Sequence, residues 1–277
     1  MAINDILVTL TSYPEPTPVA ASREAIAIAS SLGAHIAALS CEMRVEVPGR
    51  FISGAVVGLP GIIAGEAARS RQNAQALIAA FESDAAKAAV SWEAIRQTCT
   101  PAERAELLVE YARLRDLTIM PASDDRRYAE AVIFGSGRPV LILPQTPRSG
   151  TFALGIVVVA WDFSRAAARA VADAIPLLER AAKVRVVSVL NEKHLDRKHS
   201  AEELSKNLSR HGIDVMLDRV DAKGMAIGAV LEDYVASQAA DLLVMGAYGH
   251  SRLQEFVLGG ATRSLLSKPP LPILFSH

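Results

Sequence analysis

The two halves of this chain repeat one order of short apolar segments. Residues 6–8 match residues 156–158, residues 116–120 match 241–245, and residues 139–141 match 272–274. In each half such segments alternate with helical patterns, which is typical of a parallel sheet covered on both faces. The repeat predicts an α/β fold of two similar domains, residues 1–147 and 152–277, each a doubly wound, mostly parallel five-stranded sheet. The stretch "PQTPRSGT", residues 144–151, is the predicted linker.

Two length differences separate the halves. The offset between matching segments falls from 150 to 125 and then rises to 133, so the first half carries 25 extra residues and the second half eight. Residues 51–65, "FISGAVVGLPGIIAG", are the natural place for the first insertion, and Pro60 and the glycines predict a loop or flap there. The eight extra residues of the second half lie in "VMGAYGHSRLQEFVLGGATRSLL", residues 244–266.

The second half shows its elements most clearly. Ser164 is the expected N-cap of an alanine-rich helix reaching about residue 182, with Pro176 as a kink. The other expected helices cover residues 201–211 and 225–238. The expected strands are residues 155–161, 184–190, 213–220, 241–245 and 272–275.

The charge balance, the apolar runs and the cysteines limit the class of protein to which this chain can belong. With 29 basic against 30 acidic residues, bulk electrostatics does not favour nucleic acid. No apolar run is long enough for a membrane span, and the N-terminal segment lacks a signal pattern, which favours the cytoplasm. Cys41 and Cys99 stand far apart and are expected to be two ordinary thiols.

The glycine stretch of the second half poses the functional question. Gly246 and Gly249 follow an apolar strand pattern, and Gly259 and Gly260 precede a helical one, where free N–H groups attract anions. His250 adds positive character. The stretch has neither the Lys-Ser/Thr of a P-loop nor the GxGxxG spacing. The spacing alone is compatible with two interpretations, a phosphate-binding loop and an ordinary turn between a strand and a helix.

The spacing Gly246-x2-Gly249-x9-Gly259, over a chain with this repeat, resembles the universal stress protein family in its tandem form. That resemblance implies ATP or another adenine nucleotide, with or without Mg²⁺, bound in the second half. It places the ribose near Asp162 and the adenine near Val189. The implied phosphate contacts are Gly246, Gly249, His250, Gly259, Gly260, Ala261 and Thr262. It also implies that the last strands, residues 140–143 and 273–275, pair between the halves as a pseudo-dimer.

The chain departs from the family pattern in both halves. Gly260 stands where the family has Ser or Thr, which removes a hydroxyl donor and weakens binding. The first half has Thr9 to Ser12 where the second has its aspartate, lacks GxxG, and places Asp124 and Asp125 where they would repel phosphate. The first half is therefore interpreted as a degenerate nucleotide site.

No catalytic constellation accompanies these features. His194 and His199 with Asp196 lack a second cluster, so no metal is assigned. Glu103, Glu106 and Glu110 recur as on a solvated helix face. The family resemblance implies at most slow ATP hydrolysis, or self-phosphorylation at Ser251 or Thr262.

The resulting hypothesis is a cytoplasmic stress-response protein that acts as a nucleotide-dependent interaction module on protein partners not identified by the sequence. The alternative is a nucleotide-free interaction or scaffold protein of the same fold. Further pairing of the pseudo-dimer into a homodimer stays open.

Overall fold

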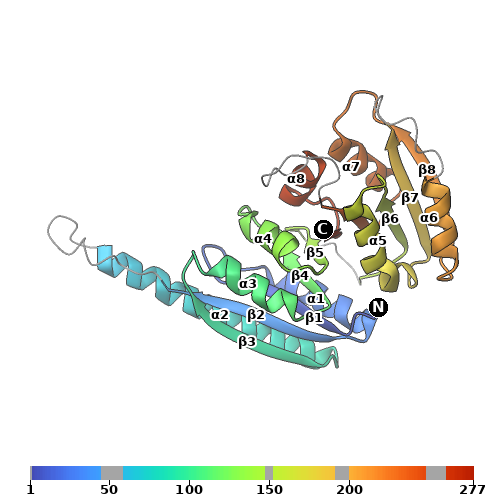
Figure 1. Cartoon of the computed structure of the whole chain (residues 1–277). Helices are drawn as coiled ribbons and strands as arrows, with labels where there is room; N and C mark the ends of the chain where they lie inside the picture. The colour runs from blue at the N-terminus through green and yellow to red at the C-terminus, as the bar shows by residue number, and fades with distance from the viewer. Residues whose placement is uncertain (1, 45–58, 147–151, 191–199, 248–259) are drawn as a thin grey trace.

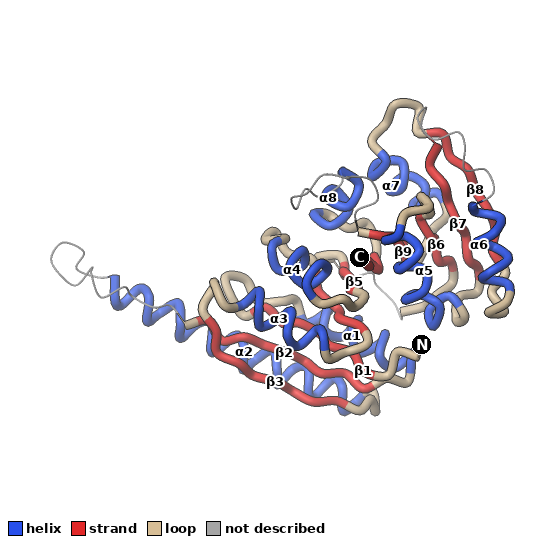
Figure 2. Tube along the Cα trace, in the orientation of Figure 1, coloured by secondary structure: helices blue, strands red, loops and turns tan. Residues whose placement is uncertain are grey.

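The computed structural model describes residues 2–44, 59–146, 152–190, 200–247 and 260–277, and these form one ten-stranded sheet with helices on both faces (Figures 1 and 2). The sheet order is β3-β2-β1-β4-β5-β10-β9-β6-β7-β8. Each half contributes five strands in equivalent order. The strands are β1 (Asp5–Thr11), β2 (His35–Met43), β3 (Trp92–Cys99), β4 (Leu117–Pro121), β5 (Val140–Leu143), β6 (Ile156–Ala160), β7 (Lys183–Leu190), β8 (Val215–Asp221), β9 (Leu242–Gly246) and β10 (Ile273–Ser276).

The helices divide into two layers that run across both halves. The helices are α1 (Val19–Leu32), α2 (Leu59–Lys87), α3 (Arg104–Arg113), α4 (Arg127–Gly135), α5 (Arg165–Leu178), α6 (Ser200–Ser209), α7 (Ile227–Ser237) and α8 (Gly260–Ser267). One core cluster joins α1, α2, α5 and α6 to one face of the sheet, and a second joins α3, α4, α7 and α8 to the other. Central strands are apolar along their length because both faces are covered.

The halves meet where β5 and β10 pair, as expected for the pseudo-dimer. The pairing is antiparallel and sets Ile273 opposite Ile142, Leu274 opposite Leu141 and Phe275 opposite Val140. All other strand pairs in the sheet are parallel. Every residue of both joining strands is buried, so the junction removes two apolar edges from water.

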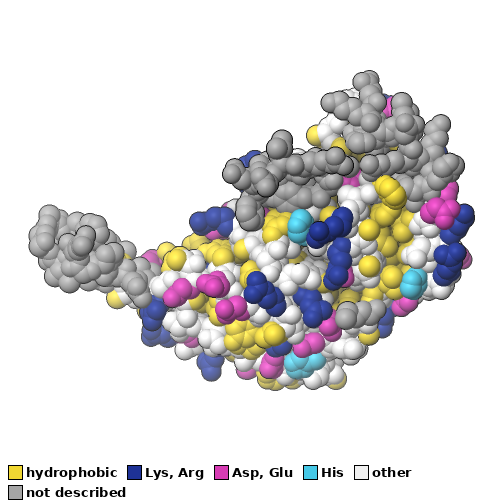
Figure 3. Space-filling model, in the orientation of Figure 1, with side chains coloured by type: hydrophobic (Ala, Val, Ile, Leu, Met, Phe, Trp, Pro, Cys, Tyr) yellow, Lys and Arg dark blue, Asp and Glu magenta, His cyan; other side chains and the backbone are white. Residues whose placement is uncertain are grey.

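The outer strands are more polar. On β8, the Asp218 carboxylate accepts hydrogen bonds from Arg185 on β7 at 2.7 Å and from Tyr234 on α7 at 2.6 Å. Burial alone would raise the pKa of Asp218, but the hydrogen bonds from Tyr234 and Arg185 hold it below its usual value. Burial and the Asp218 carboxylate raise the pKa of Tyr234 to about 12. Figure 3 shows basic and acidic side chains interspersed over the described part of the face in view.

The elements predicted for the second half are present, with ends within a few residues of those expected. Ser164 is the N-cap of α5, and its Oγ accepts a hydrogen bond from Ala167 N at 3.0 Å. Pro176 lies inside α5, two residues before its last residue. A larger difference lies in the insertion of the first half. Residues 59–65 belong to α2, so the prediction of a loop is wrong there, and residues 45–58 lie outside the described residues.

Helix α2 accommodates the residues that suggested a loop. Pro60 occupies the first turn, where a backbone N–H has no partner within the helix, so the proline costs little. A Cβ on Gly65 would meet no atom within 4 Å, so packing does not require a glycine at this position. The first turns of α2 project beyond the carboxyl ends of β2 and β3 (Figures 1 and 2).

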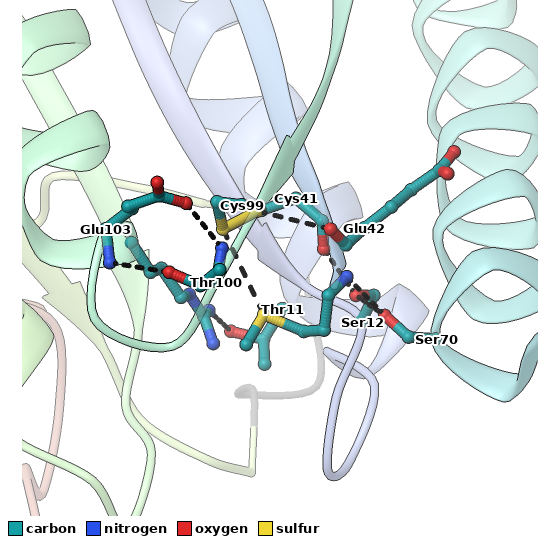
Figure 4. Close-up of a disulfide and its surroundings, with 10 residues drawn as sticks. Thr11, Ser12, Cys41, Glu42, Ser70, Cys99, Thr100 and Glu103 are labelled. Carbon is teal, nitrogen blue, oxygen red and sulfur yellow. Dashed lines mark hydrogen bonds between the residues drawn. A yellow bond between two sulfur atoms is a disulfide. The ribbon is translucent and has the colours of Figure 1, made fainter. Parts of the chain in front are cut away.

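The expectation of two ordinary thiols is also wrong. Cys41 on β2 and Cys99 on β3 form a disulfide, with Cα atoms 6.1 Å apart (Figure 4). The two strands are parallel neighbours, and Cys99 lies opposite Met43, so the cysteines are diagonal neighbours at the carboxyl ends of both strands. A sequence separation of 58 hides this proximity, because α2 crosses between the two strands.

Candidate ligand sites at the two switch points

Each half of the sheet has a point where successive connections run in opposite directions, and ligands of open parallel sheets bind beyond the carboxyl ends of the strands there. In the C-terminal half this point lies between β6 and β9, which pair in parallel with Val159 opposite Val244. In the N-terminal half it lies between β1 and β4, with Val8 opposite Ile119. The residues beyond these strand ends define the two candidate sites.

In the C-terminal half, Asp162 lies two residues beyond the end of β6 and is exposed, and its Oδ1 accepts a hydrogen bond from Ser164 N at 2.9 Å. The start of α5 therefore lies beside this carboxylate. Phe163, between them, has φ of 61° and is 53% exposed. Such a backbone conformation is uncommon for a residue other than glycine, and strained residues often mark functional sites. The sequence analysis did not identify Phe163, because no residue pattern predicts a positive φ at a phenylalanine.

Gly246 ends β9, and the structure supplies a packing reason for a glycine there. A Cβ on Gly246 would lie 2.4 Å from Ala167 N and 2.5 Å from Ala166 C. The first turn of α5 thus occupies the space beside Gly246. The contact of Gly246 with phosphate stays a prediction.

The remaining predicted site residues are only partly described. Gly260, Ala261 and Thr262 form the first turn of α8. A Cβ on Gly260 would meet no atom within 4 Å, whereas the Thr262 side chain is buried, which disfavours it as a phosphoryl acceptor in this conformation. Val189, on β7, is half-buried against the second core cluster.

Several predicted residues lie outside the described part of the chain. They are Gly249, His250, Ser251 and Gly259 of the glycine stretch and His194, Asp196 and His199 of the charged loop. Their part in any site stays a prediction. Among the described residues, no group of three His, Cys, Asp or Glu side chains is arranged to hold a metal ion. No helix in the described ranges is both long and apolar enough to cross a membrane.

The equivalent position in the N-terminal half is closed. Ser12 stands where Asp162 stands in the other half, and it is 1% exposed. Its hydroxyl donates to Cys41 O at 2.6 Å and lies 2.9 Å from the hydroxyl of Ser70 on α2, as Figure 4 shows. Asn73 of α2 donates to Ser12 O at 3.0 Å. Helix α2 therefore covers the carboxyl ends of β1 and β2.

A small cavity remains beside this closed position, between β1, β4 and the start of α4. Its volume is about 20 Å³, and Thr9, Thr11, Arg104 and Arg126 are among the residues that line it. Arg104, the first residue of α3, is buried, and the sequence analysis did not single it out. The available signal was its spacing of four residues from Leu108, which places it on the apolar stripe of that helix.

The acidic residues near this cavity are paired. Asp125 accepts hydrogen bonds from Arg127 at 2.9 and 2.8 Å, and these hold the pKa of Asp125 below its usual value. Asp124 accepts from Gln145 at 3.1 Å. Neither aspartate lines the cavity. Glu103, directly before α3, and Glu106 and Glu110, on α3, are exposed, as expected.

The fold is a tandem of two α/β halves, each with a switch point at the carboxyl ends of its central strands. Residues 154–277 match the model of the universal stress protein family. The C-terminal half of the chain belongs to that family.

Solved structures extend the likeness to the whole chain at the level of fold. A universal stress protein from Archaeoglobus fulgidus superposes with a TM-score of 0.71 at 15% identity, covering 98% of this chain and 95% of that one. A Pseudomonas aeruginosa protein described as a universal stress protein gives 0.60 at 15% identity, covering 99% and 93%. A universal stress protein of Synechocystis is 46% identical over 41 residues, which are 15% of this chain and 14% of that relative.

Proposed function

We propose that this chain binds one molecule of ATP, or a related adenine nucleotide, in its C-terminal half. On binding, it changes its contacts with protein partners in a cytoplasmic stress response. The observation that carries this proposal is the motif Gly246-x2-Gly249-x9-Gly259, which begins at the end of β9 within the residues that match the universal stress protein model.

The described geometry beside the motif supports an anionic ligand. Strands β6 and β9 are neighbours, so Asp162, just beyond β6, and Gly246, the last residue of β9, lie at adjacent strand ends. The N-terminus of α5 begins at the same edge, and a helix N-terminus favours negative charge. Asp162 would accept hydrogen bonds from ribose hydroxyls. Gly259 and Gly260 would offer backbone N–H groups to phosphates, and Mg²⁺ would accompany those phosphates. The exposed ring of Phe163 adds an apolar surface next to this carboxylate.

The two halves differ in a way that supports a single site. Where the C-terminal half exposes Asp162, the N-terminal half buries Ser12 under α2. A nucleotide placed equivalently in the first half would have to displace Ser70 and Asn73. One nucleotide per chain is therefore expected.

A second candidate function, a nucleotide-free interaction protein, is favoured by two observations. The glycine at position 246 is already required by the packing of α5. Gly260 lacks the hydroxyl that the family pattern supplies, and a lost hydroxyl donor weakens binding by about 0.5–1.5 kcal/mol. In this case the glycine stretch would act only as a turn.

Calorimetric titration with ATP in the presence of Mg²⁺ separates the two functions. The wild type is expected to bind with a stoichiometry near one, and Gly249→Val to bind at least tenfold more weakly, because a β-branched side chain would occupy the phosphate space. Gly260→Ser is the matched variant, expected to bind equally or up to about 1.5 kcal/mol more tightly. No binding at millimolar ATP would support the nucleotide-free function.

A further inference from the structure

The cavity of the N-terminal half lies beside a buried positive charge. Arg104 is 7% exposed, and one of its terminal nitrogens donates to Thr11 Oγ1 at 2.7 Å. Its guanidinium lies over the ring of Tyr128, 4.4 Å from the ring centroid. Its Nε is buried and has no hydrogen-bond partner. Among the described residues, no carboxylate lies within ion-pair distance of Arg104.

An unpaired buried cation is unfavourable, because burial removes hydration that only an anion or several hydrogen bonds replace. This cost is reflected in the pKa of Arg104, which burial lowers, while Tyr128 and the more distant Asp125 act in the opposite direction. Asp125 is itself held by Arg127. Among the described residues, Arg104 is therefore buried without a carboxylate in direct contact.

The remaining cavity wall also suits an anion. Arg126 lines the cavity; its guanidinium donates to Ser267 Oγ of α8 at 2.9 Å, and its Nε lies 3.9 Å from Glu130 Oε1. Thr9 and Ser123, which carry hydroxyl groups, are also among the lining residues. No acidic residue is among the lining residues that the structure describes. Two arginines and short hydroxyl side chains are a donor set for oxyanions.

The size of the cavity restricts the ligand. Its volume of about 20 Å³ suits one or two water molecules or a small anionic group, not a nucleoside. We propose that this cavity is a second binding site, specific for a small tetrahedral oxyanion of the phosphate or sulfate class and anchored by Arg104. It is separate from the nucleotide site proposed for the C-terminal half and does not depend on it.

Titration of the full chain with inorganic phosphate and with sulfate, followed by calorimetry and thermal unfolding, tests the proposal. An ion that binds only the folded state raises Tm. In the control titration, sodium chloride replaces the phosphate or sulfate salt at the same ionic strength. The wild type is expected to gain Tm with phosphate or sulfate and not with chloride. Ribose 5-phosphate, in a parallel titration, tells a free oxyanion from a phosphate ester, and is expected to bind at least tenfold more weakly than phosphate.

The variants assign the binding to Arg104. Arg104→Met is expected to reduce the affinity for phosphate at least tenfold. Arg69→Met is the matched control, since Arg69 is exposed on α2 in the same half, and it is expected to bind as the wild type does. Arg126→Gln, at a half-buried position, is expected to weaken phosphate binding severalfold and serves if Arg104→Met does not fold.

The two proposed sites can fail separately. Phosphate binding should persist in Gly249→Val, and ATP binding should persist in Arg104→Met. Absence of an oxyanion-specific rise in Tm in the wild type would overturn the second site. So would equal phosphate affinity in Arg104→Met and Arg69→Met, or loss of phosphate binding in Gly249→Val alone.

Discussion

Replacing Gly246 by alanine should destabilise the protein even in the absence of any ligand. The new Cβ would lie 2.4 Å from Ala167 N and 2.8 Å from Ala166 Cβ, well inside contact distance. Neither the end of β9 nor the first turn of α5 can shift easily. Gly246 pairs with Ser276 on β10, and the first turn of α5 is held by its cap at Ser164.

Overpacking of this kind costs about 1–3 kcal/mol, and the rigid backbone on both sides favours the upper part of that range. At roughly 2–4 °C for each kcal/mol, a loss of about 2–3 kcal/mol lowers Tm by roughly 4–12 °C. Urea denaturation of ligand-free protein measures the free energy of unfolding directly. Gly260→Ala is the matched control, because a Cβ there meets no atom within 4 Å, and it should change stability by less than about 1 kcal/mol. Equal stability of Gly246→Ala and wild type would refute the packing argument and return Gly246 to a role in binding alone.

Three further changes test other parts of the structure. Reduction of the disulfide, or Cys41→Ser, should lower the free energy of unfolding by about 2–4 kcal/mol, and alkylation with mass spectrometry of unreduced protein should find neither Cys41 nor Cys99 free. Tyr234→Phe should cost about 1 kcal/mol below pH 10. Since a raised pKa stabilises the fold below the unfolded pKa, that difference should vanish as pH rises toward about 12. Leu274→Ala, at the fully buried junction of the halves, should cost about 2–5 kcal/mol, whereas Met216→Ala on the exposed edge strand should cost little. Equal losses for these two variants would contradict the buried junction.

The fold was predictable because its signals are local and repeated. Apolar strands covered on both faces stand out as continuous runs, as at residues 156–160, and the serine at position 164 marks a helix start by its own chemistry. The repeat then assigns the N-terminal half the same order, and the resemblance to a known family supplied the pairing of β5 with β10.

Other features depend on contacts that no local pattern records. The bond between Cys41 and Cys99 requires the register of β2 and β3, which are separated by the longest described helix. Pro60 and Gly65 carry turn signals, yet they lie in α2, where a first-turn proline is tolerated and the packing that stabilises the helix comes from its later turns. Arg104 looks like a surface residue until Thr11 and Tyr128 are placed beside it.

Photolabelling with 8-azido-ATP followed by peptide mapping measures whether one adenine nucleotide binds in the C-terminal half. Labelled peptides are expected within residues 152–277, at no more than one label per chain, with labelling suppressed by excess ATP and strongly reduced in Gly249→Val. Labelling of residues 2–146 that ATP suppresses, or equal labelling of Gly249→Val and wild type, would contradict this expectation.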